Sequence, residues 1–422
     1  MFNAPHGWQV RCFSDFLTEV TSKNKESHPY EPLSVTQGNG VILQSQKYKR
    51  RIASEDTKNY KLAPMGSFVM NPNYLNFGAI GIQDKIEMGV VSSIYGVFVN
   101  DKTIDTDYLS YLLRSRKMIN EYNRFANGGC AVVNTGELHG MHVRLTVPIQ
   151  EFLTIKWPFP SLREQQKIAA ILSSADQSIE KTEQIIKQTE KVKKGLMQQL
   201  LTKGVAHKKF KKTPIGELPE EWEVKSLEDV VRKIVGGGTP SRKIQEFYRG
   251  NIPWVTVKDL KGKYIDSAIE SITKEGVKNS SANLIPANNV VVATRMAIGK
   301  AFKNTVDVAI NQDLKALFPN ENVIIPDFLL WVYLNQSENI ERLGTGTTVK
   351  GIRLETLKEI QLGVPTIDEQ IKITNILQTY EKKINGESKK LSGLKHVKKG
   401  LMQQLLTGKV RVPIDDEEVV ET

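Results

Sequence analysis

The sequence VKKGLMQQLLT occupies Val192–Thr202 and occurs again, unchanged, at Val397–Thr407. The match extends upstream without a gap. In that extension Pro160, Glu164, Gln165, Lys167 and Ile168 align with Pro365, Glu369, Gln370, Lys372 and Ile373. The two copies lie 205 residues apart. This period is too long for a solenoid repeat and is typical of a whole domain, so the sequence indicates an internally duplicated protein.

Each copy begins with a helix-start pattern. Ser161 precedes Glu164 by three residues, and Thr366 precedes Glu369 by the same interval. This spacing is the capping box, in which the hydroxyl and the carboxylate each accept a hydrogen bond from a backbone N–H group of the first turn. Glycine follows the far end of each copy, as it commonly does after a helix. We therefore expect one long helix from Ser161 to Leu201 and a second in the other copy.

Apolar residues in both copies recur at alternating steps of four and three over roughly five heptads, which is typical of a coiled coil. A helix of roughly 40 residues is about 60 Å long. Four polar residues interrupt the apolar seam and favour one register: Thr182, Lys193, Glu387 and Lys398. We expect the two helices to pair with each other as a rigid spacer; the alternative is that each packs on its own neighbouring domain.

Glycine also occurs inside each predicted helix, at Gly195 and Gly400. A glycine in a helix interior costs roughly 1 kcal/mol relative to alanine. Its presence predicts a close backbone approach at these positions, either by the partner helix or by another subunit.

The composition limits the class of protein. The chain has 422 residues, 40% of them hydrophobic, which suffices for two or three cores. No apolar run approaches the roughly 18 residues of a membrane-spanning helix, and the N-terminus lacks the pattern of a signal peptide. The two cysteines, Cys12 and Cys130, have no disulfide or metal-site spacing. We expect a cytoplasmic protein that does not contact a membrane.

The net charge of +11 favours a polyanionic partner. The predicted organisation along the chain is a first globular domain (1–158), a conserved helix (159–204), a basic linker (205–219), a second globular domain (220–364), a second conserved helix (365–408) and an acidic tail (409–422). The first domain has mixed α/β character, with strands predicted at Ser67–Met70 and Val90–Val99 and a helix at Tyr108–Phe125. Lysines in the linker indicate either a solvated connection or a DNA contact.

The two globular domains share a pattern but few side chains. The sequence that starts at Trp8 (WQVRCFSDF) is weakly similar to the one that starts at Trp222 (WEVKSLEDV), while the two helical segments match closely. Identical helices would meet identical partners, whereas divergent domains would recognise different ligands.

No catalytic or metal-binding motif stands out. Asn71–Tyr74 reads NPNY, near the NPPY/F motif of amino-methyltransferases, but its second proline is missing and no S-adenosylmethionine glycine motif precedes it. A polar turn between two strands is the preferred interpretation. The glycine-rich segments Gly236–Gly238 and Gly344–Gly351 do not fit a P-loop. We predict no catalytic residues, no metal site and no bound cofactor.

Several basic or polar residues are candidates for DNA contact, because lysine neutralises phosphates and arginine reads guanine in the major groove. One group clusters around Tyr48, a second comes from the NPNY segment, and a third is spread over the second domain. They are Lys47, Lys49, Arg50 and Arg51; Asn71 and Asn73; and Lys258, Arg295, Lys300, Lys303 and Lys350. Each could also be an ordinary surface side chain.

These features together resemble the specificity (S) subunit of type I restriction–modification enzymes. The resemblance rests on PFPSLREQQKIAAIL at Pro158–Leu172, VPTIDEQIKITNIL at Val364–Leu377, IGELPEEWEVKSL at Ile215–Leu227 and the two VKKGLMQQLLT segments. It covers essentially the whole chain, although the first domain lacks the GELPEEW lead-in.

The resemblance implies two target recognition domains, each reading half of a bipartite double-stranded DNA target. It also implies an antiparallel coiled coil that sets the half-site spacing. Two methyltransferase subunits would dock on the repeated helices, at Gly195, Leu196, Met197 and Gln198 and at Gly400, Leu401, Met402 and Gln403. S-adenosylmethionine, ATP and magnesium would belong to the methyltransferase and restriction subunits. A self-contained methyltransferase and a scaffold without a nucleic-acid role remain alternatives.

Overall fold

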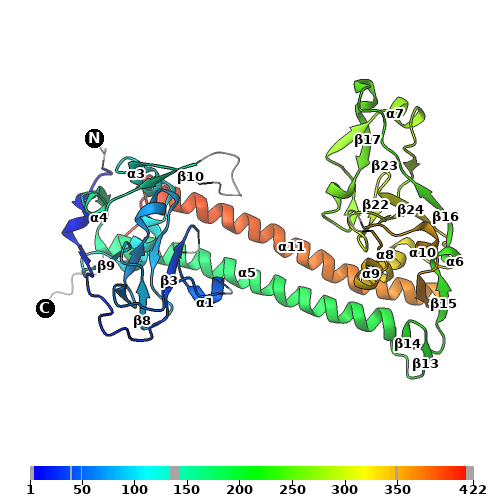
Figure 1. Ribbon diagram of the computed structural model, residues 1–422, viewed down its shortest axis with the longest axis horizontal. Helices are drawn as coiled ribbons and strands as arrows, with labels where there is room; N and C mark the ends of the chain where they lie inside the picture. The colour runs from blue at the N-terminus through cyan, green and yellow to red at the C-terminus, as the bar shows by residue number, and fades with distance from the viewer. Residues whose placement is uncertain (1–3, 39, 49, 134–141, 347–349, 415–422) are drawn as a thin grey trace. The chain divides into compact units, whose positions relative to one another are not determined.

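The computed structural model describes residues 4–38, 40–48, 50–133, 142–346 and 350–414. The chain divides into two compact units: unit 1 comprises Met1–Glu183 and Lys389–Thr422, and unit 2 comprises Gln184–Ser388. Two long helices, α5 (Leu162–Lys203) and α11 (Ile367–Leu405), each contribute one part to each unit (Figure 1). Each unit thus contains a globular domain and a segment of both helices.

The parts of α5 and α11 that share a unit run antiparallel. In unit 1, Asp176 and Glu183 of α5 form ion pairs with Lys398 and Lys395 of α11. Residue numbers therefore rise along one helix as they fall along the other. The predicted antiparallel pairing of the helices is confirmed.

Both helices also pack on the globular domains, so the two alternatives left open by the sequence occur together. The core of unit 1 includes Ile168 and Leu172 from α5, Leu405 at the end of α11, and Leu406 directly after it. The core of unit 2 includes Leu200 and Leu201 from α5 and Ile373 and Leu377 from α11. The identical leucines of the repeat are thus buried against two different domains.

Unit 1 is built from small antiparallel sheets. The largest has the strand order β2 (Leu17–Glu19), β9 (Gly96–Asn100), β6 (Phe68–Met70), β7 (Ile80–Ile82). The other strands pair two by two: β1 (Gln9–Cys12) with β12 (Lys156–Phe159), β3 (Leu33–Thr36) with β4 (Gly40–Leu43), β5 (Lys61–Pro64) with β8 (Met88–Val91), and β10 (Asn127–Val133) with β11 (His142–Thr146). Its helices are η1 (Phe13–Asp15), α1 (Gln44–Lys47), η2 (Pro72–Phe77), α2 (Thr106–Leu113), α3 (Arg116–Tyr122) and α4 (Ile149–Leu153).

Two predicted elements of unit 1 are each divided in two. The strand expected at Val90–Val99 is interrupted by a turn in which the N–H of Tyr95 donates to the carbonyl of Ser92. Its halves, β8 and β9, belong to different sheets. The helix expected at Tyr108–Phe125 ends at Leu113 and restarts because the Ser115 hydroxyl accepts from the N–H of Met118 as an N-cap. Apolar periodicity alone could not place these breaks.

In unit 2, the end of α5 is followed by the hairpin of β13 (Phe210–Thr213) and β14 (Gly216–Pro219), so residues 205–219 contain paired strands. The first of its two larger sheets has the strand order β16 (Val231–Gly236), β24 (Leu314–Pro319), β21 (Val290–Ala293), β22 (Ala301–Asn304), β18 (Tyr264–Ile265). The second has the order β19 (Glu270–Ile272), β17 (Tyr248–Val255), β23 (Val308–Ile310), β20 (Leu284–Ile285). The remaining elements are β15 (Glu223–Ser226), α6 (Leu227–Val230), η3 (Gln245–Phe247), η4 (Val257–Asp259), α7 (Lys274–Lys278), α8 (Pro326–Asn335), α9 (Ser337–Arg342), α10 (Leu354–Lys358) and β25 (Gln361–Val364).

Strand β21 shows how unit 2 is layered. All four of its residues are buried. Val290 and Val292 join the core formed with α8, whereas Val291 and Ala293 join a second core with residues of β23. Because successive side chains of a strand point to opposite faces, the sheet containing β21 lies between α8 and the second sheet. In Figure 1, α7 and β17 form the end of unit 2 remote from α8 and α9.

The first strand of each globular domain pairs with the strand that leads into the following long helix. Gln9 of β1 lies opposite Phe159 of β12, and Glu223 of β15 lies opposite Val364 of β25. The two units therefore repeat the same mixed α/β plan. Within the part of the chain that the structure describes, no helix is both long and apolar enough to span a membrane.

Candidate DNA and subunit interfaces

The repeated glutamine at the start of each long helix anchors a helix of the neighbouring domain. The Gln165 side chain accepts from the N–H of Asp105, the N-cap of α2, at 2.9 Å and donates to the carbonyl of Pro160 at 3.0 Å. Gln370 accepts from the N–H of Ile325, the N-cap of α8, at 2.9 Å. Both glutamines are at most 1% exposed. This explains why the repeat retains glutamine here: an aliphatic residue would leave a helix N-terminus unsatisfied.

The repeated glutamate is only half of a capping box. The N–H of Glu164 donates to the Ser161 hydroxyl at 3.3 Å, and the N–H of Glu369 donates to the Thr366 hydroxyl at 3.4 Å, as predicted. The predicted return bond from each carboxylate is wrong, because both carboxylates have other partners. The Glu164 carboxylate accepts from the Arg411 guanidinium at 2.7 and 2.8 Å.

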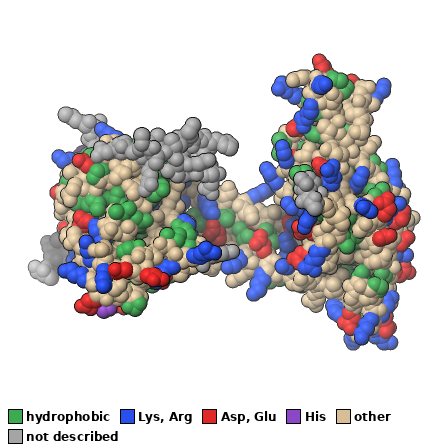
Figure 2. Space-filling view, in the orientation of Figure 1, with side chains coloured by type: hydrophobic (Ala, Val, Ile, Leu, Met, Phe, Trp, Pro, Cys, Tyr) green, Lys and Arg blue, Asp and Glu red, His purple; other side chains and the backbone are tan. Residues whose placement is uncertain are grey.

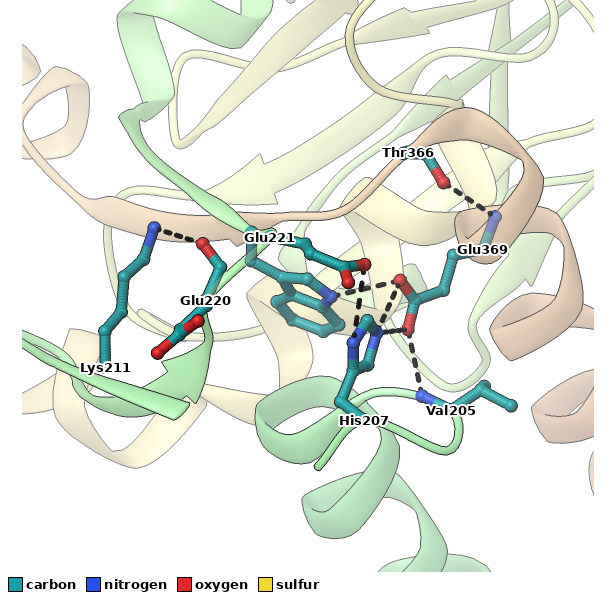
Figure 3. A network of polar contacts seen from close by, with 8 residues as sticks. Val205, His207, Lys211, Glu220, Glu221, Thr366 and Glu369 are labelled. Atoms are coloured by element: carbon teal, nitrogen blue, oxygen red, sulfur yellow. Dashed lines mark hydrogen bonds and ion pairs between the residues drawn. The ribbon is translucent and has the colours of Figure 1, made fainter. Parts of the chain in front are cut away.

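Glu369 joins three segments of unit 2 (Figure 3). Its carboxylate accepts from the N–H of Val205 at 2.9 Å and from the Trp222 indole at 3.1 Å. The His207 ring lies 2.9 Å from it. The carboxylate thus ties the end of α5 and the start of the second globular domain to the first turn of α11.

Equivalent acidic residues connect the helices with their domains. Glu381 of α11 pairs with Lys193 of α5 at 2.7 Å and with Lys263 of the globular domain at 2.8 Å. Burial opposes ionisation of Glu381, but the hydrogen bonds from both lysines outweigh it and lower its pKa. At the equivalent position of α5, Asp176 pairs with Lys398 and accepts from the Tyr111 hydroxyl at 2.9 Å. Lys193 and Lys398, predicted to fix register, are therefore compensated in the same way in both units.

The predicted methyltransferase-docking residues lie partly on the surface of each helix. Gln198 and Gln403 are exposed, whereas Leu196, Met197, Leu401 and Met402 are half-buried. A Cβ atom added at Gly195 or Gly400 would meet no atom within 4 Å. A close approach by the partner helix, one of the two explanations for these glycines, is therefore wrong. Approach by another subunit remains a prediction.

In unit 1, the second repeat borders a basic groove of about 550 Å³. Met402 and Gln403 line it together with Arg116 and Lys117 of α3 and Lys399 of α11. The sequence did not indicate this groove, because α3 and the repeat are far apart along the chain.

The candidate DNA-contacting residues of unit 1 fall into two environments. Arg50 and Arg51 are exposed, as is Lys47, whose ammonium lies 5.3 Å from the centre of the Tyr48 ring. Lys49 lies outside the described residues. The described part of the basic cluster is thus on the surface, at the end of α1 and directly after it.

The Asn71–Tyr74 segment follows β6 and opens η2, which is the predicted polar turn between strands. The Asn71 side chain accepts from the N–H of Asn73 and donates to the Tyr95 hydroxyl at 3.1 Å, and it is 7% exposed. Asn73 accepts from the Thr146 hydroxyl at 3.0 Å. Asn71 is therefore a buried cap, a placement that does not suit a direct DNA contact.

In unit 2, two candidates come together. The Arg295 backbone forms a bridge with Gly351, and the N–H of Met296 donates to the carbonyl of Lys350 at 3.3 Å. Arg295 and Lys350 are both exposed, so the loop after β21 and the segment before α10 share one surface. The proximity of Arg295 to Lys350 could not be read from the sequence, in which 54 residues separate them.

The remaining candidates of unit 2 are dispersed. Lys258 is exposed on η4 and Lys300 is exposed before β22. Lys303 pairs with Asp327 of α8 at 2.8 Å and is largely buried, so it has a structural role between β22 and α8. On the visible face of unit 2, lysine and arginine side chains also lie at the end that carries β17 and α7 (Figure 2).

Comparison with known proteins gives one consistent family. Residues 5–191 and residues 219–396 each match the type I restriction modification DNA specificity domain. The type I restriction enzyme MjaVIII specificity subunit of Methanocaldococcus jannaschii is 28% identical over 97% of this chain and 94% of its own length.

Two solved structures have a similar fold. The S subunit of a type I restriction–modification system from M. genitalium gives a TM-score of 0.57 at 15% identity, over 96% of this chain and 97% of that chain. A second chain comes from a structure concerned with complex assembly and conformational transition of the type I R-M system. It gives a TM-score of 0.60 at 14% identity, over 97% of this chain and 100% of that chain.

Proposed function

The chain belongs to the type I restriction–modification DNA specificity family, and we propose that its two globular domains read the two halves of a bipartite, asymmetric DNA target. The protein is the DNA sequence-specificity subunit of a type I restriction–modification complex. One observation carries the bipartite proposal: two long helices that share an identical 11-residue segment bear two domains with the same plan but different side chains. Different side chains imply different half-sites, and hence an asymmetric target.

In this proposal the paired helices set the distance between the half-sites and dock two methyltransferase subunits. The exposed glutamines and the open backbone at Gly195 and Gly400 support docking on the repeats. Because the repeated sequence is the same in both units, it suits two copies of one partner. Restriction subunits would join this assembly.

The chain itself would carry no catalytic residue. S-adenosylmethionine would be bound by the methyltransferase subunits, and ATP and magnesium by the restriction subunits. The buried capping role of Asn71 supports this assignment over a self-contained methyltransferase, since a base-holding asparagine needs an accessible amide.

DNA binding tests the proposal at the cluster around Tyr48. The triple variant Lys47→Ala, Arg50→Ala, Arg51→Ala should weaken binding of the complex with methyltransferase subunits to its target and flatten the fall of affinity with salt. A charge-matched control replaces the exposed Lys25, Lys102 and Lys156 of the same unit. Equal affinity and salt dependence in the two triple variants would exclude the cluster as a contact. A wild-type complex without salt-dependent, sequence-specific binding would contradict the function itself.

A further inference from the structure

A loop of unit 2 presents an apolar side chain on a fixed backbone. The loop joins β21 to β22, and the N–H of Thr294 at its start donates to the carbonyl of Asp313 at 2.9 Å. The carbonyl of Thr294 accepts from the N–H of Ile352 at 2.9 Å, and the N–H of Met296 donates to the carbonyl of Lys350. The loop backbone is therefore held by two separate segments, one at Asp313 and the other at Lys350 and Ile352.

Met296 combines two unusual properties. Its side chain is 71% exposed, the largest fraction among the large apolar residues that the structure describes. Its backbone has φ of 62°, in the left-handed region. Such a conformation is unfavourable for a side chain other than glycine, asparagine or aspartate and is concentrated at functional sites. Neither burial nor turn chemistry explains a methionine at this position.

Two basic residues, Arg295 and Lys350, lie next to Met296. Arg295 is half exposed, and one of its guanidinium nitrogens lies 3.6 Å from the Asp313 carboxylate. The other oxygen of that carboxylate accepts from the Asn311 side chain at 2.8 Å. Lys350 is exposed on the adjacent segment. Asp313 thus orients the guanidinium while most of the local positive charge faces solvent.

This combination fits DNA better than an apolar protein surface. Arginine pairs with guanine O6 and N7, lysine contacts phosphates, and an apolar side chain beside them contacts the 5-methyl group of thymine in the major groove. A hydrophobic protein partner would instead require Arg295 and Lys350 to lose water without compensation.

We propose that Met296 is a specificity-determining residue whose side chain contacts a thymine methyl group in the half-site read by unit 2, next to a base contact made by Arg295. This inference rests on the proposed function. The Met296 residue is exposed, and the backbone bonds of Met296 to Lys350 and of Thr294 to Ile352 hold the loop that carries it.

Removal of the thymine methyl group tests the contact. Once the methylated motif of the wild-type complex is mapped, each thymine is replaced by uracil in a target duplex. Affinity of the wild type should fall about fourfold at one position, as expected for loss of one buried methyl group of about 0.8 kcal/mol. That thymine should lie next to a base pair at which the sequence preference of the Arg295→Ala variant differs from that of the wild type.

The informative variant is Met296→Gly, because glycine accepts the left-handed backbone and removes only the side chain. Met296→Gly should bind thymine and uracil duplexes equally, whereas Met296→Leu should retain the preference. Ile269→Gly, which removes another exposed apolar residue of unit 2 (66% exposed), should behave as the wild type. Thermal unfolding of the variants separates recognition from folding.

A thymine preference that persists in Met296→Gly would overturn the inference, as would a half-site without an A·T pair. Weaker binding of methyltransferase subunits with unchanged DNA recognition would also overturn it and indicate a protein contact. Failure of the wild-type complex to give a split motif would instead contradict the proposed function, so the two failures are distinguishable.

Discussion

The ammonium group of Lys193 lies 2.7 Å from the carboxylate of Glu381, and the same ion pair recurs with Lys398 and Asp176 at positions displaced by one repeat. Each pair joins the two long helices inside one unit. Each acidic residue also holds its own globular domain, through Lys263 in unit 2 and Tyr111 in unit 1. The register of the helices and the attachment of the domains are therefore coupled at one carboxylate.

Disruption of the pair in unit 2 should destabilise the chain. Glu381 and Lys193 are 15% and 16% exposed, so Glu381→Gln or Lys193→Met leaves a poorly hydrated charge without its main partner. Each single variant should lower the unfolding free energy by about 1–3 kcal/mol. The double variant should lose less than the sum, as a double-mutant cycle from chemical denaturation would measure. Lys191→Met, exposed on α5, is the control; strict additivity of the pair would contradict the coupling.

The same carboxylate predicts a pH dependence. The pKa of Glu381 is lowered in the folded chain, so its contribution is present above the unfolded-state pKa of about 4.3 and is lost as pH falls through the folded-state pKa. Stability measured by denaturation from pH 7 downward should decrease in this acidic range. Glu381→Gln should show a smaller decrease than the wild type. Parallel curves for the two proteins would contradict the assignment.

The duplication and the pairing of two long helices could be predicted because heptad spacing and the exact repeat of the VKKGLMQQLLT segment are directly visible in the sequence. The antiparallel direction was implied only by the family resemblance. The sequence predicted that Ser161 and Thr366 cap helices, but not where the following carboxylates bind. Partners such as Arg411 and His207 come from distant segments, and spacing cannot reveal them.

The candidate site was less predictable than the fold. Arg295 and Lys350 were selected separately, as basic residues in a loop-like and a glycine-rich stretch, but only the tertiary structure brings them together. Met296 could not be selected from the sequence, because neither its exposure nor its positive φ can be read from a single methionine. Asn71 was selected for a motif resemblance and is instead a buried cap.

The repeat glycines predict opposite effects on folding and assembly. Because a Cβ at Gly195 or Gly400 meets no atom within 4 Å, alanine at both positions should stabilise the isolated chain, by about 0.5–1 kcal/mol each. If a methyltransferase subunit approaches the backbone there, the same variants should bind it more weakly. Thermal unfolding and calorimetric titration would measure the two effects.

Gly386→Ala and Gly393→Ala provide matched controls, because these glycines of α11 lie outside the repeat and are equally open. They should stabilise the chain without weakening assembly. Unchanged methyltransferase binding in the Gly195 and Gly400 variants would exclude close approach at the repeat.

Lengthening of both helices should change the spacing of the half-sites alone. One heptad can be inserted after Glu183 and another after Ser388, at the boundaries between the units, which leaves the contacts inside each unit intact. Seven residues add about 10 Å of helix, or about three base pairs. Methylation mapping should find both half-sites unchanged and the gap longer. Altered half-site sequences with an unchanged gap would contradict the spacer role.

The most direct test of the account is to map methylated adenines in DNA from cells that express this chain with its methyltransferase subunit. The account predicts a split, non-palindromic motif with a fixed gap, and no such methylation when this chain is omitted. Equal methylation without the chain, or an active methyltransferase that yields no split motif, would contradict it.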